Sequence, residues 1–467
     1  MKAIQIKDIV KAVSGTLAWG DETQEITGVV TDSREAASGV LFVPIIGERV
    51  DAHRFIPEVL EQGASCVFSS RTDVACAEGA CIYVEDTLRA LQDFAAWYRS
   101  LFSIPVIGVT GSVGKTTTKE MIAAVLEKKY KTLKTFRNLN SQIGVPLMMF
   151  QLEEDTEIAV FEMGISMPQE MERLAAIARP DCAVMTNIGV SHIGNLGSRE
   201  NICAEKGKII TYFPENGVLY VCGNGDLKEM SGENIPYDRC QGNCETIYYG
   251  MEEGCVYYAD EVRPQPDGQQ FLFHYPQGQF PVELSVMGTH NVNNAIVALA
   301  LALRYEVPME QAAEALKEYR PIQMRGVIHE WEGVHIIDDT YNASPDSIVG
   351  NLRALFDYPD DGRRLAVLGD VLELGEQSRE LHERIARFIV NEAGRGRQLS
   401  LLVVVGQETQ AIAGYVSAHS GIEVVSCENN GQAAETIKSR KESGDWILVK
   451  GSRGMHMDEV VKQLIEG

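Results

Sequence analysis

The chain has 467 residues, of which 45% are hydrophobic and 23% charged, and its formal net charge is -24 at pH 7. This composition is typical of a soluble globular protein, and a prior of roughly 150 residues per domain predicts three domains. The excess of acidic residues argues against nucleic acid or an anionic membrane surface as a partner. An anionic ligand would therefore have to be held by local binding devices.

Targeting signals are missing from the sequence. The N-terminal segment has no long apolar run and no cleavage site, and no stretch of about 18 or more apolar residues occurs. We therefore expect a cytoplasmic protein without a signal peptide or a membrane span. The ten cysteines lack C-x-x-C spacing, including the loose cluster of Cys240, Cys244 and Cys255. This pattern favours free thiols over a metal site.

The first unit, residues 1–103, is predicted to be a small α/β domain. Strands are expected at 29–31, 41–43 and 66–68, with a helix at 54–62. A polar run, Thr31-Asp32-Ser33-Arg34, separates the first two strands, and a second polar cluster at 47–53 follows the next strand. Either run could be an ordinary loop, but two such clusters at strand ends indicate a binding edge.

The second unit, residues 104–320, opens with an apolar strand at 106–109 and a glycine-bearing turn that leads into a helix. The turn reads Thr110-Gly111-Ser112-Val113-Gly114-Lys115-Thr116-Thr117. Its glycines let successive N–H groups face one concavity, and the helix N-terminus adds partial positive charge, which suits phosphate. Lys115, expected in an exposed loop, would reach the β- and γ-phosphates, and Thr116 would offer a hydroxyl to Mg²⁺. Val109 stands where the strict P-loop pattern has glycine, so this is a variant of that loop.

Strands alternate with helical patterns in the rest of this unit, which predicts a parallel sheet covered by helices. One strand, 157–161, ends in Glu162, and another, 182–186, is followed by His192. Ligands bind beyond the carboxyl ends of such strands, so Lys115, Glu162 and His192 are expected at one edge. A carboxylate that ends an apolar strand needs a partner, and Mg²⁺ is a natural one.

Two further positions have competing interpretations. The segment 288–294 opens a helix that runs to Leu303, and Asn291 could simply cap it, while Asn294, in the first turn, could hydrogen-bond a base edge. Lys206, taken alone, is expected to pair with Glu205 or another acid on a solvated face.

The third unit, residues 321–467, is predicted to be another parallel, Rossmann-like α/β layer. Its strands are expected at 335–338, 365–368, 401–405 and 446–449. The first strand has no G-x-G-x-x-G after it, so no dinucleotide site is predicted. It ends instead in the polar segment 338–346, and polar loops at 369–370 and 450–453 follow later strands.

Together these segments resemble the Mur ligase family, the ATP-dependent amide-forming enzymes of peptidoglycan synthesis. The resemblance covers essentially the whole chain. It rests on the P-loop and on the segments 138–146, 162–164, 187–192, 205–207, 288–294, 338–345 and 368–375, together with Arg325. Val371 stands where the family more often has Met, a conservative change.

The resemblance implies three domains with the boundaries above and a role for each motif. The UDP end of a substrate would contact Thr31, Asp32, Ser33 and Arg34, and the substrate's phosphates or peptide would contact Asn138 and Asn140. ATP phosphates would be held by Gly111, Ser112, Val113, Gly114, Lys115, Thr116 and Thr117. Adenosine would lie against Asn294, Arg325 and Tyr341, with Asp339 and Asn342 at the γ-phosphate end. Mg²⁺ would be held by Thr116, Glu162, His192 and Lys206, the last as a carbamate formed with CO₂.

The motifs most resemble the family member that adds D-alanyl-D-alanine to a UDP-N-acetylmuramoyl-tripeptide. That reaction proceeds through an acyl phosphate and needs ATP and Mg²⁺, and we expect a monomer. Alternatives are a member that adds a single amino acid, a folylpolyglutamate-type ligase, and a regulator that binds nucleotide without turnover. The 342–345 segment argues against the first alternative and the 32–34 segment against the second. Intact Lys115, Glu162, His192 and Lys206 argue against the third.

Overall fold

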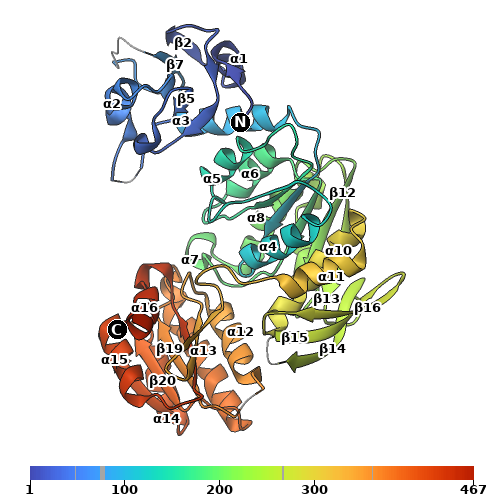
Figure 1. Cartoon of the computed structure of the whole chain (residues 1–467), viewed down its shortest axis with the longest axis vertical. Helices are drawn as coiled ribbons and strands as arrows, with labels where there is room; N and C mark the ends of the chain where they lie inside the picture. Colours follow the sequence, from blue (N-terminus) through green and yellow to red (C-terminus); the bar gives the residue numbers. More distant parts are fainter. Residues whose placement is uncertain (48, 74–78, 266–267, 360, 467) are drawn as a thin grey trace.

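The computed structural model describes residues 1–47, 49–73, 79–265, 268–359 and 361–466. Its main sheets follow one another along the chain and along the longest axis of the molecule (Figure 1). The first lies at the top, the second fills the middle, and the third lies at the lower left. Among the described residues, no helix is long and apolar enough to cross a membrane. The α/β fold class expected from the sequence is confirmed.

The first sheet has five strands in the order β2-β7-β6-β5-β4, and only the β2–β7 pair is antiparallel. Its strands are β2 (Thr16–Trp19), β4 (Gly28–Val30), β5 (Val40–Phe42), β6 (Cys66–Ser69) and β7 (Ala80–Tyr83). The accompanying elements are β1 (Ile4–Gln5), β3 (Glu25–Ile26), α1 (Ile6–Ala12), η1 (Ser33–Glu35), η2 (Ala52–Phe55), α2 (Ile56–Glu61) and α3 (Thr87–Arg99). The helix expected at 54–62 is thus divided. Pro57, which lacks an N–H, occupies the first turn of its α-helical part.

The second sheet has nine strands in the order β16-β15-β14-β13-β12-β11-β8-β10-β9. They are β8 (Val106–Thr110), β9 (Thr132–Lys134), β10 (Ile158–Glu162), β11 (Cys182–Met185), β12 (Asn216–Cys222), β13 (Asn243–Gly250), β14 (Tyr257–Gln265), β15 (Gly268–Tyr275) and β16 (Gly278–Leu284). The expectation of a parallel sheet is wrong at one end, because β15 runs antiparallel to both β14 and β16. Two residues join β15 to β16, too few for the crossover that parallel strands require.

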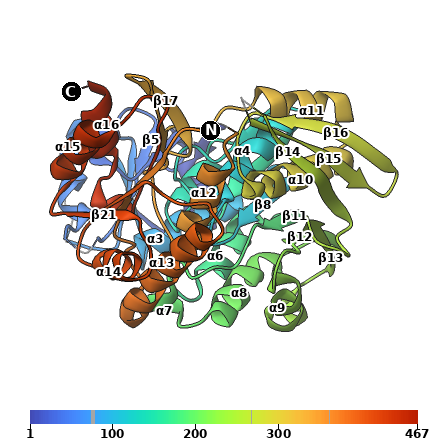
Figure 2. The ribbon, with the colours of Figure 1, turned by 90° about the horizontal axis from the view of Figure 1, so that it is seen from below.

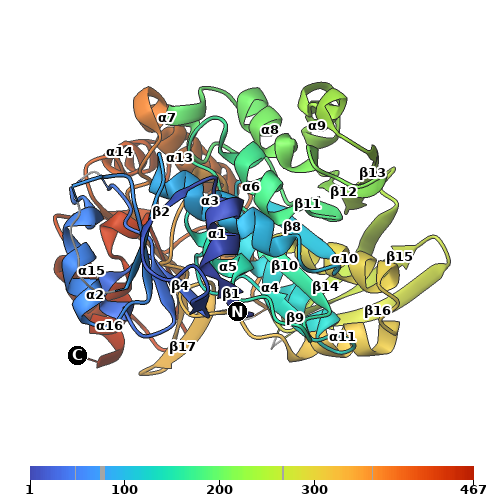
Figure 3. The same ribbon diagram turned by 90° about the horizontal axis from the view of Figure 1, so that it is seen from above.

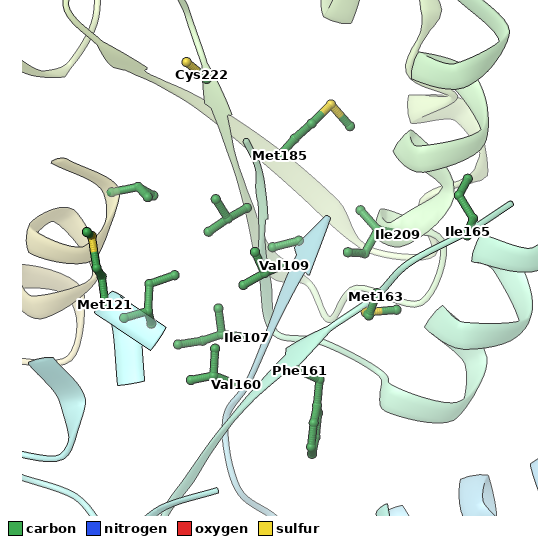
Figure 4. Close-up of a cluster of buried hydrophobic side chains, with 14 of the residues drawn as sticks. Ile107, Val109, Met121, Val160, Phe161, Met163, Ile165, Met185, Ile209 and Cys222 are labelled. Carbon is green, nitrogen blue, oxygen red and sulfur yellow. The ribbon is translucent and has the colours of Figure 1, made fainter. Parts of the chain in front are cut away.

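Helices cover both faces of the parallel part of this sheet. They are α4 (Lys115–Leu126), α5 (Gly144–Met149), α6 (Glu170–Ala178), α7 (Ile193–Leu196), α8 (Arg199–Gly207), α9 (Leu227–Asn234), α10 (Thr289–Arg304) and α11 (Met309–Glu318), with the short η3 (Lys208–Ile210) and η4 (Tyr237–Arg239). Figure 4 shows Met121 of α4 on one side of β8 and Met163 and Ile209 on the other. Burial on both faces explains the uninterrupted apolar run of β8, which is fully buried.

The third sheet has six strands in the order β17-β18-β22-β19-β20-β21, with only β17–β18 antiparallel. They are β17 (Val327–Trp331), β18 (Val334–Asp338), β19 (Arg364–Gly369), β20 (Leu401–Val405), β21 (Glu423–Cys427) and β22 (Trp446–Lys450). The helical elements are α12 (Pro345–Asp357), η5 (Gly375–Gln377), α13 (Ser378–Gly394), α14 (Gln410–His419), α15 (Asn430–Arg440), η6 (Arg453–Met455) and α16 (Asp458–Glu466). Ser344 and Ser347 form a capping box and Pro345 occupies the first turn, so α12 begins sharply after the polar segment.

Each outer unit touches the middle one through a small set of elements. Helix α3 packs on α5 and α6, as the view from above shows (Figure 3). On the other side, α7 contacts η5, and α7 lies beside α13 in the view from below (Figure 2). A Cβ atom added to Gly375 would lie 3.3 Å from the Cα of Gly194, so two glycines permit this close approach. The contact between α7 and η5 therefore joins the segment that follows β11 in the second sheet to the segment that follows β19 in the third sheet.

Candidate active site

The P-loop turn is held open by two glycines and braced by an asparagine. Gly111 and Gly114 have φ angles of 144° and 85°, which favour glycine. The side-chain oxygen of Asn187 accepts hydrogen bonds from the backbone N–H groups of Ser112 (3.1 Å) and Val113 (2.8 Å). Sequence reasoning gave Asn187 no role of its own, although a polar residue just after a buried strand was the available signal.

Lys115 does not lie in an exposed loop, as the sequence had suggested. It is the first residue of α4 and is partly buried. Its Nζ donates to the carbonyl oxygens of Gly111 (2.9 Å) and Ser112 (3.4 Å), so the side chain folds back over the turn. Burial lowers the pKa of Lys115 below its usual range, and this shift is opposed by the charge of Glu162. The lysine therefore lies close to both the turn and the carboxylate.

Glu162 is only 2% exposed, and both of its carboxylate oxygens are engaged. Thr116 Oγ1 donates to Oε2 at 2.8 Å, and Asn140 Nδ2 donates to Oε1 at 2.6 Å. The backbone N–H of Glu162 donates to Thr135 Oγ1 at 2.8 Å. Three residues that the sequence pointed to, Thr116, Asn140 and Glu162, are thus brought together from α4, a loop and β10.

Lys206 does not lie on a solvated face, so that interpretation is wrong. The residue is 1% exposed, and the neighbouring Glu205 pairs with Lys208 at 2.5 Å instead. Burial, reinforced by the charge of Lys115, lowers the pKa of Lys206 well below its usual range. Lys206, in α8, is therefore deprotonated more easily than an exposed lysine.

His192 meets the third unit across the contact between the sheets. Its Nδ1 lies 2.7 Å from Glu373 Oε2, without the alignment of a hydrogen bond. Both residues have left-handed φ angles, 60° and 63°, a conformation that is costly away from glycine and that concentrates at functional sites. Burial lowers the pKa of His192; Glu373 opposes this shift, and Lys206 and Lys115 add to it.

The first turns of α10 pack against α4. Asn294 Oδ1 accepts from Thr118 Oγ1 at 2.9 Å, and Asn294 Nδ2 donates to Asn291 Oδ1 at 3.2 Å. The capping interpretation of Asn291 is wrong, because α10 already begins at Thr289 and its N-cap is Gly288. The amide of Asn291 donates to the carbonyl oxygen of Met287.

The third unit contributes a polar cluster around Asp339. Lys450, which is 2% exposed, pairs with Asp339 and donates to the carbonyl oxygen of Asn342 at 2.9 Å. The guanidinium of Arg325 lies 4.0 Å from the ring centroid of Tyr341. Sequence reasoning placed Lys450 at a strand end but missed that it fixes Asp339.

A cavity of about 1200 Å³ runs between the second and third units. Its walls include most of the residues expected at the site: Ser112, Val113, Gly114, Lys115, Thr116, Thr117, Asn138, Asn140, Glu162, His192, Asn294, Arg325, Asp339, Tyr341 and Asn342.

The polar run of the first unit is not part of this wall. There Asp32 accepts from the Arg34 backbone N–H at 3.0 Å and from its side chain at 2.9 Å, and these bonds lower the pKa of Asp32 to about 2. In the second polar cluster Asp51 pairs with His53 at 2.7 Å, and Glu48 lies outside the described residues.

The oxygen atoms around Glu162 suit a hard cation whose remaining ligands come from phosphates and water. Within the described ranges, no group of three or more His, Cys, Asp or Glu side chains could hold a metal by itself. Mg²⁺ in nucleotide sites commonly uses one or two protein carboxylates and completes its shell with phosphates and water. The hydroxyl of Thr116 and the carboxylate of Glu162, beside a phosphate-binding turn, fit that arrangement. The nine described cysteines are free thiols.

Comparison with known proteins agrees with this geometry along the whole chain. Family models described as "Mur ligase family, catalytic domain", "Mur ligase middle domain" and "Mur ligase, glutamate ligase domain" match residues 25–99, 109–302 and 324–453. A Bacillus subtilis protein named UDP-N-acetylmuramoyl-tripeptide--D-alanyl-D-alanine ligase is 37% identical over 465 residues, covering 99% of this chain and 98% of that protein. The chain belongs to the Mur ligase family.

Solved structures of Mur ligases share the fold. A crystal structure of MurF from Acinetobacter baumannii superimposes with a TM-score of 0.89 at 30% identity, covering 100% of both chains. MurF from Thermotoga maritima in complex with ADP superimposes with a TM-score of 0.82 at 29% identity, covering 94% of this chain and 96% of that one. The resemblance inferred from the motifs is therefore confirmed for this Mur ligase.

Proposed function

We propose that this Mur ligase uses ATP to join D-alanyl-D-alanine to a UDP-N-acetylmuramoyl-tripeptide. The observation that carries the proposal is a shared cavity: the second unit presents a P-loop with Glu162 to it, and the third unit presents Asp339 and Tyr341. Relatives similar over their full length have this ligase activity in their names, and one solved neighbour is a complex with ADP.

The phosphates of ATP would lie in the P-loop turn, residues 111–117. Its backbone N–H groups, the start of α4 and the ammonium group of Lys115 all favour negative charge there. Adenosine would lie against Asn294, Arg325 and Tyr341, with Asp339 and Asn342 closing the site from the third unit. Binding between two units places the nucleotide where their relative position affects turnover.

Mg²⁺ would be held by Thr116, Glu162 and His192, and by Lys206 once its amine has reacted with CO₂ to form a carbamate. The buried lysine fits this role because a neutral amine is needed for the reaction and an ammonium ion would repel the metal. When bound, the metal neutralises charge on the phosphates. Asn140, which already donates to Glu162, would orient that carboxylate.

The reaction we propose has two bond-forming steps. A carboxylate oxygen of the tripeptide attacks the γ-phosphorus of ATP, giving an acyl phosphate and ADP. The amine nitrogen of D-alanyl-D-alanine then attacks the acyl carbon, phosphate leaves with the bonding electrons, and the amine loses a proton. Lys115 faces the negative charge that develops on the transferred phosphoryl group, and such preorganised charge is a large source of rate enhancement.

The remaining expected residues would hold the UDP-sugar peptide. Thr31, Asp32, Ser33 and Arg34 form a polar edge on the first unit, and the side chain of Arg34 is 87% exposed. Asn138 and Asn140 line the cavity nearer the P-loop. A long substrate reaching from the first unit to the cavity would contact both sets.

A panel of substrates that follows phosphate release tests the proposal. We expect turnover only when ATP, a UDP-N-acetylmuramoyl-tripeptide and D-alanyl-D-alanine are all present. Equal turnover with a single amino acid in place of the dipeptide would identify a different member of the family. Turnover with a folate and glutamate would identify a folylpolyglutamate-type ligase. ADP binding without any turnover on the panel would favour a regulator.

A further inference from the structure

Helix α4 carries a second buried lysine, one turn after the P-loop lysine. Lys119 has a side chain that is 1% exposed, and its Nζ donates to the backbone carbonyl oxygen of Thr135 at 2.7 Å and to Glu120 Oε1 at 2.5 Å. A lysine is rarely buried to this extent unless its charge has defined partners. The P-loop pattern does not require a lysine here, and the mechanism above does not use it.

Thr135 connects this lysine to Glu162. The residue is 1% exposed and directly follows β9, and its N–H donates to the carbonyl oxygen of Val160 at 3.0 Å. Its hydroxyl accepts the backbone N–H of Glu162 at 2.8 Å, while its carbonyl oxygen accepts from Lys119. One threonine therefore carries contacts from α4 on one side and from the end of β10 on the other.

The same helix holds Glu162 at a second point. Thr116 lies three residues before Lys119, a spacing that places two residues on the same face of a helix, and its hydroxyl donates to Glu162 Oε2. The chain that leaves Thr135 also carries Asn140, which donates to the other carboxylate oxygen. Glu162 is thus tied to α4 directly through Thr116 and indirectly through Lys119 and Thr135.

We propose that Lys119 is a positioning residue that fixes Glu162, through Thr135, in the orientation that binds the metal of the nucleotide site. This inference rests on the proposed function, which gives Glu162 its role toward Mg²⁺. By joining α4 to the ends of β9 and β10, Lys119 makes the phosphate-binding turn and the carboxylate one rigid unit. A purely structural ion pair with Glu120 would not have this consequence.

The chain supplies a matched control for that distinction. Lys134 pairs with the same carboxylate, Glu120, at 3.1 Å and also with Glu127 at 3.2 Å, but only Lys119 bonds the carbonyl oxygen of Thr135. Lys134→Met removes a cation of the same size from Glu120 and leaves the route to Glu162 intact. Thr135→Val is the complementary change, since it keeps the shape and the carbonyl group but removes the hydroxyl that accepts from Glu162.

The experiment measures Mn²⁺ binding by electron paramagnetic resonance in the presence of a non-hydrolysable ATP analogue. Loss of a residue that orients a metal ligand typically weakens metal binding by about 10- to 100-fold. We expect Lys119→Met and Thr135→Val to raise the Kd for Mn²⁺ about 10-fold or more, and Lys134→Met to leave it within about 2-fold. In phosphate-release assays the KM for Mg²⁺ should rise in the same two variants, while the KM for D-alanyl-D-alanine stays unchanged.

Thermal melting shows whether each variant is folded. If Lys119→Met does not fold, Thr135→Val and the double variant Lys119→Met/Glu120→Gln, which removes both members of the ion pair, replace it. A folded variant of either kind with the wild-type Kd for Mn²⁺ would overturn the proposal, and so would a Lys134→Met variant that weakens binding equally.

A Glu162→Gln variant separates this inference from the proposed function. If Glu162→Gln weakens Mn²⁺ binding and the Lys119 and Thr135 variants do not, only the role of Lys119 is wrong. If Glu162→Gln leaves Mn²⁺ binding unchanged, the metal role of Glu162 is wrong, and the role of Lys119 is overturned with it.

Discussion

Three lysines of the second unit, Lys115, Lys119 and Lys206, differ in burial and in the groups that they contact. Lys115 folds over the carbonyl oxygens of its own turn, and Lys119 reaches Thr135 and Glu120. Lys206 lies buried without pairing to its neighbour Glu205. Because burial penalises charge, the environments rather than the residue type determine what each lysine can do.

Lys115→Ala should lower turnover by about 10²–10³-fold, as expected for the loss of one preorganised charge contact to the transferred phosphoryl group. The melting temperature should change little, because the side chain donates to carbonyl oxygens of its own turn and its charge is penalised by burial. Phosphate release and differential scanning fluorimetry measure both effects. Near-full turnover would mean that this turn does not hold the transferred phosphate. Lys128→Ala, two residues after the end of α4 and paired with Glu318, is the control.

Lys206→Ala should also lose most activity, and short carboxylic acids should partly restore it by occupying the position of the carbamate. Lys206→Arg should not be restored, because its guanidinium fills the space and cannot react with CO₂. Turnover measured with and without added acetate or formate distinguishes these outcomes. An alanine variant as active as the parent would exclude the carbamate as a required group.

Lys206 should also affect stability as a function of pH. Its pKa is lowered in the folded protein, so the unfolded chain binds more protons and stability rises with pH between that lowered value and the ordinary value of 10.5. In CO₂-free buffer, urea unfolding of the wild type should therefore gain more stability from pH 7 to pH 9 than unfolding of Lys206→Met. Parallel curves for the two proteins would contradict the lowered pKa of Lys206 in the folded protein.

At the scale of elements, the contact between the second and third units depends on a glycine. Asp346, in the first turn of α12, accepts from the backbone N–H of Val190 at 3.2 Å and pairs with Arg384. A Cβ atom added at Gly189 would lie 2.2 Å from Asp346 Oδ2. The segment that carries His192 therefore lies closer to the Asp346 carboxylate than a side chain at residue 189 would allow without a shift.

Gly189→Ala should push the two units apart without unfolding either one. We expect turnover to fall at least about 10-fold, because a closed site is assembled from both units, while ADP binding to the P-loop falls less. Small-angle X-ray scattering should report a larger radius of gyration. Gly414→Ala, on α14 where an added Cβ meets no atom within 4 Å, is the control. An unchanged scattering profile and turnover would show that this contact does not govern the site.

At the scale of the whole molecule, the protein is strongly negative although its proposed ligands are also negative. The net charge of -24 repels polyanions, yet the proposed substrates carry phosphates. The conflict is resolved locally, because the P-loop offers backbone N–H groups, a helix start and Lys115 inside a cavity. Binding of small phosphorylated ligands and rejection of polyanionic surfaces are therefore compatible in one protein.

We accordingly expect no retention on heparin or DNA columns and no co-sedimentation with anionic phospholipid vesicles at physiological ionic strength. ADP should bind under the same conditions, since its phosphates reach the local site. Isothermal titration with ADP, run beside the column and vesicle assays, provides the comparison. Tight binding to DNA or to the vesicles would reveal a basic surface that the overall charge conceals. Sedimentation equilibrium should give the mass of one chain.

Local patterns in the sequence determine much of this protein by themselves. The P-loop is a contiguous run whose glycines, lysine and threonine act within one turn, so its location follows from sequence. Glu162 could be placed at a strand end because an apolar run that stops at a carboxylate can be recognised in the sequence. The family, too, could be recognised from short motifs. The boundaries at 103 and 320 and the roles of the site residues stay predictions.

The tertiary structure decided what depends on meetings between distant segments. The burial of Lys206, the bracing of the P-loop by Asn187, the Lys450–Asp339 pair and the route from Lys119 through Thr135 to Glu162 join residues separated by up to 111 positions. The antiparallel strands β14 to β16 were missed because many of their residues are only partly buried, so the hydrophobic pattern along each strand is weak. A residue's neighbours along the chain set its local conformation, but solvent exposure, charge partners and pKa arise only when the packed elements bring remote side chains together.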